Sequence, residues 1–281
     1  MQAFETDWVL VAAMAVNHYE NFPVGSLLLP ARFRHPVALI YRFAREADDF
    51  ADEGEVPAAV RLARLATFRS EIDRIEAGVA PTIAWFGALA EVIREHRLPH
   101  DAFRDLISAF SQDVTKARYA NFAEMLDYCQ RSANPVGRLL LQLYGCPSAQ
   151  HLGYSDAICS SLQIINFLQD VAIDYRKGRI YLPQDELARF GIPERQIAAS
   201  DTGGNWPEFI AYQIARARAL LHSGAPLGRA LQGRIGMEMR MIIAGGDRIL
   251  TKIARVGGDV FRRRPILRTH DWPLMLVRAL S

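Results

Sequence analysis

Apolar side chains recur at intervals of three and four residues along most of the chain. These intervals place apolar residues on one face of a helix. Period-two alternation between hairpin turns is absent, and no segment repeats at a fixed period. The clearest helical runs lie at 39–47, 62–72, 89–93 and 103–110. The pattern therefore predicts an all-α protein.

Short segments rich in glycine, proline and small polar residues separate the predicted helices. None is long enough to be a linker between domains, because connections between helices of one domain commonly have about two to eight residues. We therefore expect a single domain over residues 1–281, built from about ten helices. The separating segments lie at 77–81, 145–148, 191–193, 200–207 and 223–226.

The composition is that of an ordinary folded protein. Half of the 281 residues are apolar, and 33 Lys and Arg stand against 31 Asp and Glu, which leaves a net charge of +2. This balance argues against nucleic-acid binding through bulk charge, so no nucleic-acid partner is expected. The three cysteines, Cys129, Cys146 and Cys159, have no CxxC spacing and fit a reducing compartment better than a disulfide framework.

The N-terminal region lacks the pattern of an export signal or a membrane anchor. The first Lys or Arg is Arg32, whereas a signal peptide carries such residues ahead of its apolar stretch. The longest unbroken apolar run, from Trp8 to Val16, falls well short of the roughly 20 residues that a bilayer-spanning helix needs. We therefore expect a cytoplasmic protein.

The first cluster of candidate chemistry is an acidic segment at 48–53. On a helix, Asp48 and Asp52 are four residues apart and face the same way, with Asp49 beside them. Two such charges about 6 Å apart repel by roughly 3 kcal/mol at an effective dielectric of about 20. A bound cation or protonation relieves this repulsion. The alternative interpretation is a solvated acidic end of a helix.

A second set of oxygen-bearing side chains lies in a nearly apolar stretch from Leu162 to Ile173, which we expect to form a buried, central helix. Asn166, Asp170 and Asp174 share one face of it at i, i+4 and i+8. Buried carboxylates are costly unless a partner, a proton or a metal neutralises them. Because His and Cys are missing from the set, its oxygens predict Mg²⁺, with Mn²⁺ as a substitute.

Basic residues follow directly after the second acidic set, at Arg176, Lys177 and Arg179. Mg²⁺ usually keeps several waters and binds the phosphate oxygens of a substrate, so the acidic and basic groups together indicate a metal-bridged diphosphate site. For the basic residues alone, charges favoured by a helix C-terminus are the alternative. The patterns of dinucleotide, P-loop, serine-hydrolase and zinc-protease sites are absent from the sequence.

A third feature is an excess of basic residues between 248 and 268, where seven Lys and Arg accompany one acid, Asp259. Such an excess could help to hold a diphosphate or attract an anionic membrane surface. A solvated helix face is the alternative.

The paired acidic segments resemble those of the squalene/phytoene synthase family, the head-to-head trans-prenyl synthases. The resemblance covers nearly the whole chain and is most specific at 166–183, which ends in Gly-Arg-Ile-Tyr-Leu-Pro. It implies an isoprenoid-synthase-type helical bundle around a central cavity. The other matching segments are Phe22-Pro23, 27–30, Tyr41 and Arg45 ahead of 48–53, Tyr128-Cys129 and Val136-Gly137.

Within this family, the chain resembles most the bacterial hydroxysqualene synthases of hopanoid biosynthesis. The segments 17–23 and 128–137, and Gln169 directly before Asp170, carry this resemblance. Both segments depart from the pattern of most squalene and phytoene synthases, which have a serine-containing segment in place of 20–23 and an Ala-Gly step in place of 133–135. The resemblance implies that presqualene diphosphate is ionised with Mg²⁺ and that water captures the cation, without a nicotinamide cofactor.

Two other functions stay open. One is a squalene or phytoene synthase that condenses two prenyl diphosphates head to head, and the other is a noncatalytic helical assembly factor on the same fold. A hydroxysqualene synthase, by contrast, would be functionally coupled to a presqualene diphosphate synthase and to a hydroxysqualene reductase. Peripheral contact with the inner face of a membrane is compatible with a poorly soluble C30 product.

The resemblance also implies roles for individual residues. The expected metal ligands are Asp48, Asp49, Asp52, Asn166, Asp170 and Asp174. The expected catalytic residues are Asp48, Asp52, Asp170, Asp174 and Tyr128. Phosphate oxygens are expected to meet His18, Tyr41, Arg45, Lys177 and Arg179. Asn134 and Gln169 are expected to orient the water. The expected aromatic wall comprises Phe22, Phe43, Phe50, Tyr128 and Phe167, and packing in the apolar core is the alternative for each of these except Tyr128.

Overall fold

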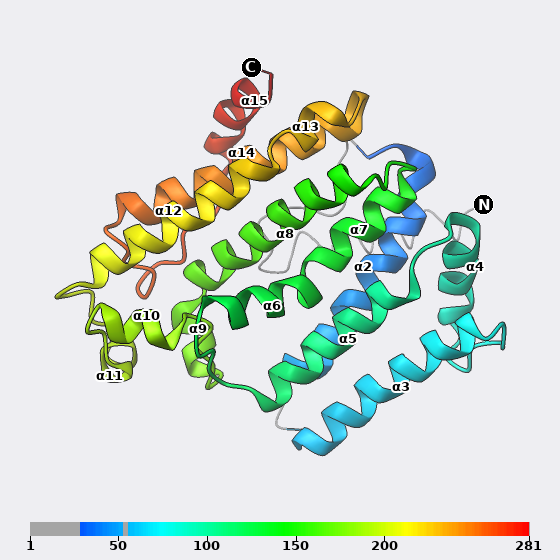
Figure 1. Cartoon of the computed structure of the whole chain (residues 1–281), viewed down its shortest axis with the longest axis horizontal. Helices are drawn as coiled ribbons and strands as arrows, with labels where there is room; N and C mark the ends of the chain where they lie inside the picture. The colour runs from blue at the N-terminus through cyan, green and yellow to red at the C-terminus, as the bar shows by residue number, and fades with distance from the viewer. Residues whose placement is uncertain (1–28, 53–55, 281) are drawn as a thin grey trace.

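The computed structural model describes residues 29–52 and 56–280. These residues form α-helices, one short 3₁₀ helix and an isolated parallel bridge between Arg118 and Ile180, which confirms the all-α prediction (Figure 1). The helices are α2 (Ala31–Asp52), α3 (Ala58–Glu76), α4 (Phe86–His96), α5 (His100–Thr115), α6 (Phe122–Ser132), α7 (Asn134–Leu143), α8 (Ala149–Gln169), α9 (Val171–Arg176), α10 (Gln184–Arg189), α11 (Glu194–Ala198), α12 (Trp206–Gly224), α13 (Leu227–Ala230), α14 (Gly233–Arg255), η1 (Thr269–Asp271) and α15 (Trp272–Leu280).

Three of the predicted turn segments, 77–81, 145–148 and 191–193, lie in breaks between helices, whereas 200–207 and 223–226 each overlap one end of α12 by two residues. Polar side chains help to start two of these helices. The Asn121 side chain accepts a hydrogen bond from the Glu124 N–H at the start of α6, and the Ser148 hydroxyl accepts one from the His151 N–H at the start of α8. Within the described residues, no helix is both long enough and apolar enough to cross a membrane.

Helix α8 lies at the centre of the molecule, as the apolar stretch predicted (Figure 1). It packs against α6, α7, α12 and α14. The buried apolar side chains form two cores, one built mainly from α2 to α5 and the other from α6, α8, α12 and α14. The functional cavity is lined by residues from both cores.

The contact between α8 and α12 depends on a close approach at Gly224. A Cβ atom at this position would lie 2.4 Å from the Tyr154 carbonyl oxygen and 2.6 Å from Cγ1 of Ile158. We expect Gly224→Ala to lower the free energy of unfolding by about 1–3 kcal/mol, because the two helices must separate. Urea unfolding measures this change.

The matched control is Gly153→Ala, also in a helix of this contact but with no atom within 4 Å of the added Cβ. The control is expected to raise the free energy of unfolding by about 0.5–1 kcal/mol, because alanine favours a helix interior. Equal effects of the two substitutions would contradict the proposed close packing.

Candidate active site

A cavity of about 980 Å³ runs beside α2 and α8 and is lined by residues of both apolar cores. Its apolar part is formed by side chains such as Val37 and Ile40 of α2, Leu162 of α8 and Met239 of α14. From Val37 to Asp48, α2 rises by about 16 Å. The cavity is therefore long enough along this helix for an extended hydrocarbon chain.

Five of the six predicted metal ligands line this cavity. Asp48 and Asp52 lie in the last turns of α2, and Asn166, Asp170 and Asp174 lie at the end of α8 and in α9. The two acidic segments are thereby brought to the same cavity, although 118 residues separate Asp52 from Asp170 in the sequence. The sixth, Asp49, is not part of the cavity wall and instead pairs with Arg45 at 2.5 Å.

The predicted continuous helix through Asp174 is interrupted at Asp170, where α8 ends and α9 begins. The backbone ladder nevertheless persists. The N–H of Asp170 donates to the Asn166 carbonyl at 2.9 Å, and the N–H of Asp174 donates to the Asp170 carbonyl at 2.8 Å. Because one helical turn still separates successive members, the i, i+4, i+8 spacing keeps all three side chains on the cavity.

Two of the cavity carboxyls are poorly neutralised by the protein. Burial, and next the charge of Asp52, raise the pKa of Asp48 to about 8. Burial, and next the charge of Asp170, raise the pKa of Asp174 to about 8, and Asp52 on the other acidic segment adds to this rise. The charge of Asp52 on one acidic segment thus opposes the ionisation of Asp174 on the other.

The other two carboxylates have closer basic partners than Asp48, which lies 3.6 Å from Arg45. Although burial opposes its ionisation, Arg179 and Lys177 hold the pKa of Asp52 below its usual value, with nitrogen-to-oxygen distances of 2.5 and 2.7 Å. Arg264 binds Asp170 through two hydrogen bonds of 2.5 and 3.0 Å. The cavity wall thus combines two carboxylates that have close basic partners, Asp52 and Asp170, with two carboxyls, Asp48 and Asp174, whose pKa values are raised.

The donor set fits a divalent cation such as Mg²⁺, because every candidate ligand is a carboxylate or amide oxygen and two buried carboxyls have raised pKa values. Within 29–52 and 56–280, no three His, Cys, Asp or Glu side chains gather closely enough to hold one ion. The four cavity carboxyls lie as two i, i+4 pairs, Asp48–Asp52 and Asp170–Asp174. Mg²⁺ commonly binds one or two carboxylates and completes its shell with water and substrate phosphate, so the pairs still fit.

A buried hydrogen-bond network supports the wall behind the acids. Asp113, on α5, accepts hydrogen bonds from the hydroxyls of Tyr128 and Tyr181, the latter at 2.8 Å, and lies 3.8 Å from Arg179. Burial raises the pKa of Asp113 to about 6, against the effect of these donors. The network ties α5, α6 and the segment after α9 together beside Asp52.

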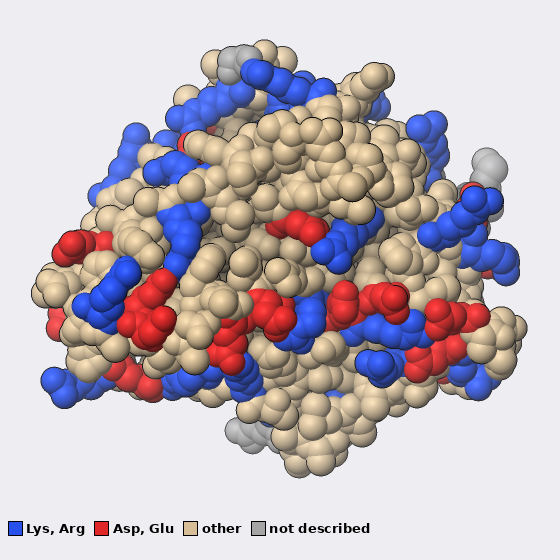
Figure 2. Space-filling view, in the orientation of Figure 1, with Lys and Arg blue, Asp and Glu red and all other residues tan. Residues whose placement is uncertain are grey.

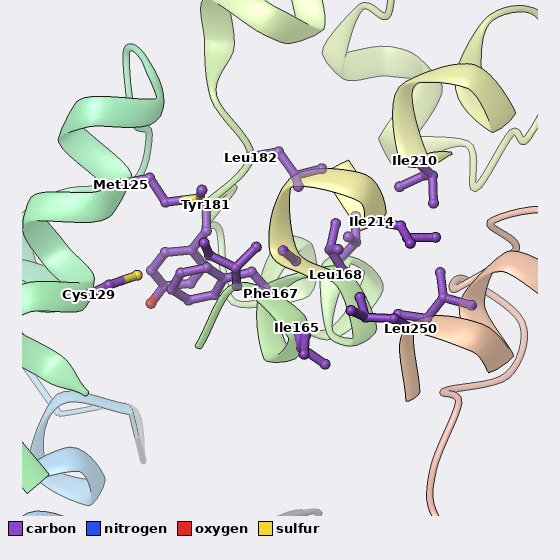
Figure 3. Packing of buried hydrophobic residues seen from close by; sticks show 14 of the residues in the cluster. Met125, Cys129, Ile165, Phe167, Leu168, Tyr181, Leu182, Ile210, Ile214 and Leu250 are labelled. Carbon is purple, nitrogen blue, oxygen red and sulfur yellow. The ribbon is translucent and has the colours of Figure 1, made fainter. Parts of the chain in front are cut away.

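Aromatic rings line the cavity next to this network. The rings of Phe167 and Tyr181 stack with centroids 4.0 Å apart (Figure 3), and Tyr128 lies 5.5 Å from Tyr181. Aromatic faces attract cations, and they also exclude water. The cavity thus offers an aromatic, electron-rich surface close to its acidic residues.

Several predicted residues lie away from the cavity wall. Asn134 is buried and accepts a hydrogen bond from the Ser160 hydroxyl, and Gln169 is buried and donates to the Pro265 carbonyl. Neither residue lines the cavity, and one polar atom of each binds a protein partner. Their expected role in orienting a water stays a prediction. Phe43 and Phe50 pack against Phe68 in the α2–α5 core, on the side of α2 away from the acids, and are not cavity residues.

Of the predicted phosphate-binding residues, Tyr41, Arg45 and Lys177 line the cavity. Arg179 does not line it, because its buried guanidinium binds Asp52. His18, like Phe22 of the predicted wall, lies outside the described residues.

Asp113, Tyr181 and Arg264 belong to this site but were not predicted as site residues from the sequence. Two of them could have been found, because Tyr181 lies in the most specific segment of the family resemblance and Arg264 lies in the basic excess of 248–268. No sequence pattern marks Asp113, because its hydrogen-bond partners Tyr128 and Tyr181 lie far from it along the chain.

The family model of squalene/phytoene synthase matches residues 15–271 of the chain. The chain belongs to this family. It is 35% identical over 233 residues to a hydroxysqualene synthase of Rhodopseudomonas palustris, with 82% of this chain and 78% of that protein covered. It is 32% identical over 241 residues to a hydroxysqualene synthase of Sinorhizobium fredii, with 85% and 81% covered.

A crystal structure of a squalene synthase from Alicyclobacillus acidocaldarius matches this squalene/phytoene synthase family member with a TM-score of 0.80 and 34% identity, over 92% of this chain and 96% of that one. The resemblance found in the sequence is therefore confirmed, as is the isoprenoid-synthase-type helical fold. The chain is an enzyme of isoprenoid biosynthesis built on the fold of the prenyl-transferring synthases.

Proposed function

We propose that this enzyme ionises presqualene diphosphate with the help of Mg²⁺, and that water captures the cation to give hydroxysqualene and inorganic diphosphate. The observation that carries the proposal is a single cavity that combines two acidic segments with a long apolar wall. Support for this product comes from the two hydroxysqualene synthases to which the chain is 32% and 35% identical.

The acidic residues and their basic neighbours would receive the diphosphate. Mg²⁺ held by the pairs Asp48–Asp52 and Asp170–Asp174 would neutralise charge on the leaving diphosphate. Arg45 and Lys177 line the same wall and present charged donors to phosphate oxygens. The Lys177 side chain is 41% exposed, so it can leave Asp52 and follow the diphosphate with little loss of packing.

The aromatic wall would hold the cation after the diphosphate has left. The carbon–oxygen bond to diphosphate breaks with both electrons on oxygen, and Tyr128, Phe167 and Tyr181 face the remaining carbocation. Water then forms a new carbon–oxygen bond and releases one proton. Because neither carbon nor oxygen is reduced overall, this reaction requires no hydride donor.

A second candidate function is the condensation of two prenyl diphosphates to squalene or phytoene. This function is favoured by the 34% identity to the squalene synthase from Alicyclobacillus acidocaldarius. A noncatalytic assembly role has no comparable support, because the cavity retains Asp48, Asp52, Asp170 and Asp174.

The two catalytic functions are separated by incubating the purified enzyme with Mg²⁺ and either presqualene diphosphate or farnesyl diphosphate, with and without NADPH. We expect hydroxysqualene from presqualene diphosphate, at a rate that does not depend on NADPH and that chelation of Mg²⁺ abolishes. Mass spectrometry after incubation in ¹⁸O-labelled water should show one labelled oxygen in the product. Consumption of farnesyl diphosphate alone would contradict the proposal.

A further inference from the structure

The C-terminal helix α15 exposes an apolar surface that no described residue covers. Of the ten large hydrophobic side chains that are exposed in the described part of the chain, six lie within 266–280. Val277 is 65% exposed and Leu280 71%, and Arg278 is the only charged residue of α15. A contiguous exposed apolar surface on a folded protein marks an interaction site.

The opposite face of α15 is well anchored. Met275 and Ala279 are buried, and α15 packs against α14. Directly before α15, the buried carboxylate of Asp271 pairs with Arg248 at 2.7 Å and also binds Lys252, both on α14. The exposed face is therefore presented by a helix that is held in place.

We propose that the exposed face of α15 docks the enzyme onto an anionic lipid bilayer. A helix of nine residues extends about 14 Å and cannot span a bilayer, but it can lie in the interface with its apolar side chains among the acyl chains. The choice of a bilayer as partner also rests on the proposed function, because an apolar substrate and product partition into lipid.

The charge around the helix favours an anionic partner. From residue 248 to 280 the chain carries eight Lys and Arg and two acids, Asp259 and Asp271. Arg255, Arg263 and Arg268 are exposed. Figure 2 shows Lys and Arg on both sides of the C-terminal end at the top of the view, with few acidic side chains near them. A second copy of this chain would bring the same arginines together, whereas anionic head groups would neutralise them.

The cavity reaches the docking helix. Trp272 and Met275 of α15 line the cavity together with Ile235 and Met239 of α14. Trp272 is also 43% exposed, so one residue belongs both to the cavity wall and to the outer surface. Docking at α15 would therefore place the apolar end of the cavity at the lipid surface, from which a hydrocarbon chain can pass without crossing water.

Vesicle flotation tests this proposal without substrate, so its result is independent of the proposed reaction. The probes are vesicles of phosphatidylcholine alone and of phosphatidylcholine mixed with phosphatidylglycerol. The double variant Val277→Gln/Leu280→Gln is expected to partition into the mixed vesicles at least about tenfold more weakly than the wild type, because it removes apolar area that would enter the bilayer. The matched control is Val60→Gln/Val79→Gln, which changes two side chains of 43% and 47% exposure outside α15 and should bind as the wild type does.

A charge variant tests the choice of lipid. Arg263→Ser/Arg268→Ser is expected to weaken binding to the mixed vesicles about tenfold, and added salt should weaken wild-type binding in the same direction. Urea unfolding of each variant shows whether the fold is retained. Three results would overturn the proposal: a wild type that does not float with mixed vesicles, a Val277→Gln/Leu280→Gln variant that floats as well as the wild type, or a wild-type dimer that this variant dissociates.

Discussion

Replacement of Asp174 by asparagine is expected to reduce turnover of presqualene diphosphate by about a thousandfold or more. The substitution keeps the side-chain size but removes one of the cavity carboxylates that lack sufficient positive charge. Charge stabilisation by a bound metal contributes several kcal/mol to a transition state, and about 4 kcal/mol corresponds to a thousandfold in rate. Single-turnover kinetics at saturating Mg²⁺ measure this loss.

The same substitution is expected to stabilise the metal-free enzyme at alkaline pH. Folding raises the pKa of Asp174 from 3.8 to about 8, so the ionised carboxylate opposes folding. Wild-type stability should therefore fall as the pH rises through this range, and the asparagine variant should lack this part of the loss. Thermal unfolding in a chelator at a pH of about 5 and of about 9 compares the two proteins.

The matched control for Asp174→Asn is Asp101→Asn, at a side chain that is 88% exposed on α5. The control is expected to change neither turnover nor the pH dependence of stability, because an exposed surface substitution usually alters stability by no more than about 0.5 kcal/mol. Turnover of Asp174→Asn within a few-fold of the wild type would remove Asp174 from the proposed site.

Replacement of Asp113 by leucine is expected to lower the free energy of unfolding by about 3 kcal/mol or more. It leaves the buried hydroxyls of Tyr128 and Tyr181 without their acceptor and takes one of two carboxylate partners from Arg179. Each buried donor without a partner costs about 1–3 kcal/mol, and the loss of one member of a buried ionic network adds to this cost. Guanidinium unfolding at neutral pH measures the difference.

Asp113→Asn is the matched variant, because it retains a carbonyl oxygen as acceptor for one of the hydroxyls. Its effect on the free energy of unfolding should be clearly smaller than that of the leucine variant. Tyr181→Phe removes only one donor and should cost about 1 kcal/mol. If Asp113→Leu unfolds at the same denaturant concentration as the wild type, the network does not stabilise the cavity wall.

Residue spacing predicted which side chains of the central helix share a face, but it did not predict the hydrogen-bond partners of buried polar residues. Asn166, Asp170 and Asp174 could be placed on one cavity face from their spacing alone, because a helical ladder repeats every turn even through the break at Asp170. Asn134 and Gln169 could not be placed in this way. Their polar groups bind Ser160 and Pro265, and such partners become visible only after the chain has folded.

The sequence also did not show whether an aromatic residue on an apolar helix face lies in the core or at the cavity. Phe43 and Phe167 both have the spacing of a buried helical face, yet Phe43 packs in the α2–α5 core and Phe167 lines the cavity. A buried core and an apolar cavity select the same residue types, because both exclude water. Sequence pattern alone therefore cannot separate the two environments.

Local spacing and residue type predict the all-α fold, the central helix α8, the approximate positions of the turns and the two acidic segments. By contrast, the folded chain is needed to see that Arg264 binds Asp170, that Asp113 accepts hydrogen bonds from Tyr128 and Tyr181, and that the cavity extends to α15. The hydrogen-bonded residues are 15 to 94 positions apart, and the cavity joins α2 to α15, the first and the last of the described helices. Their contacts arise from how the helices pack, which no local periodicity encodes.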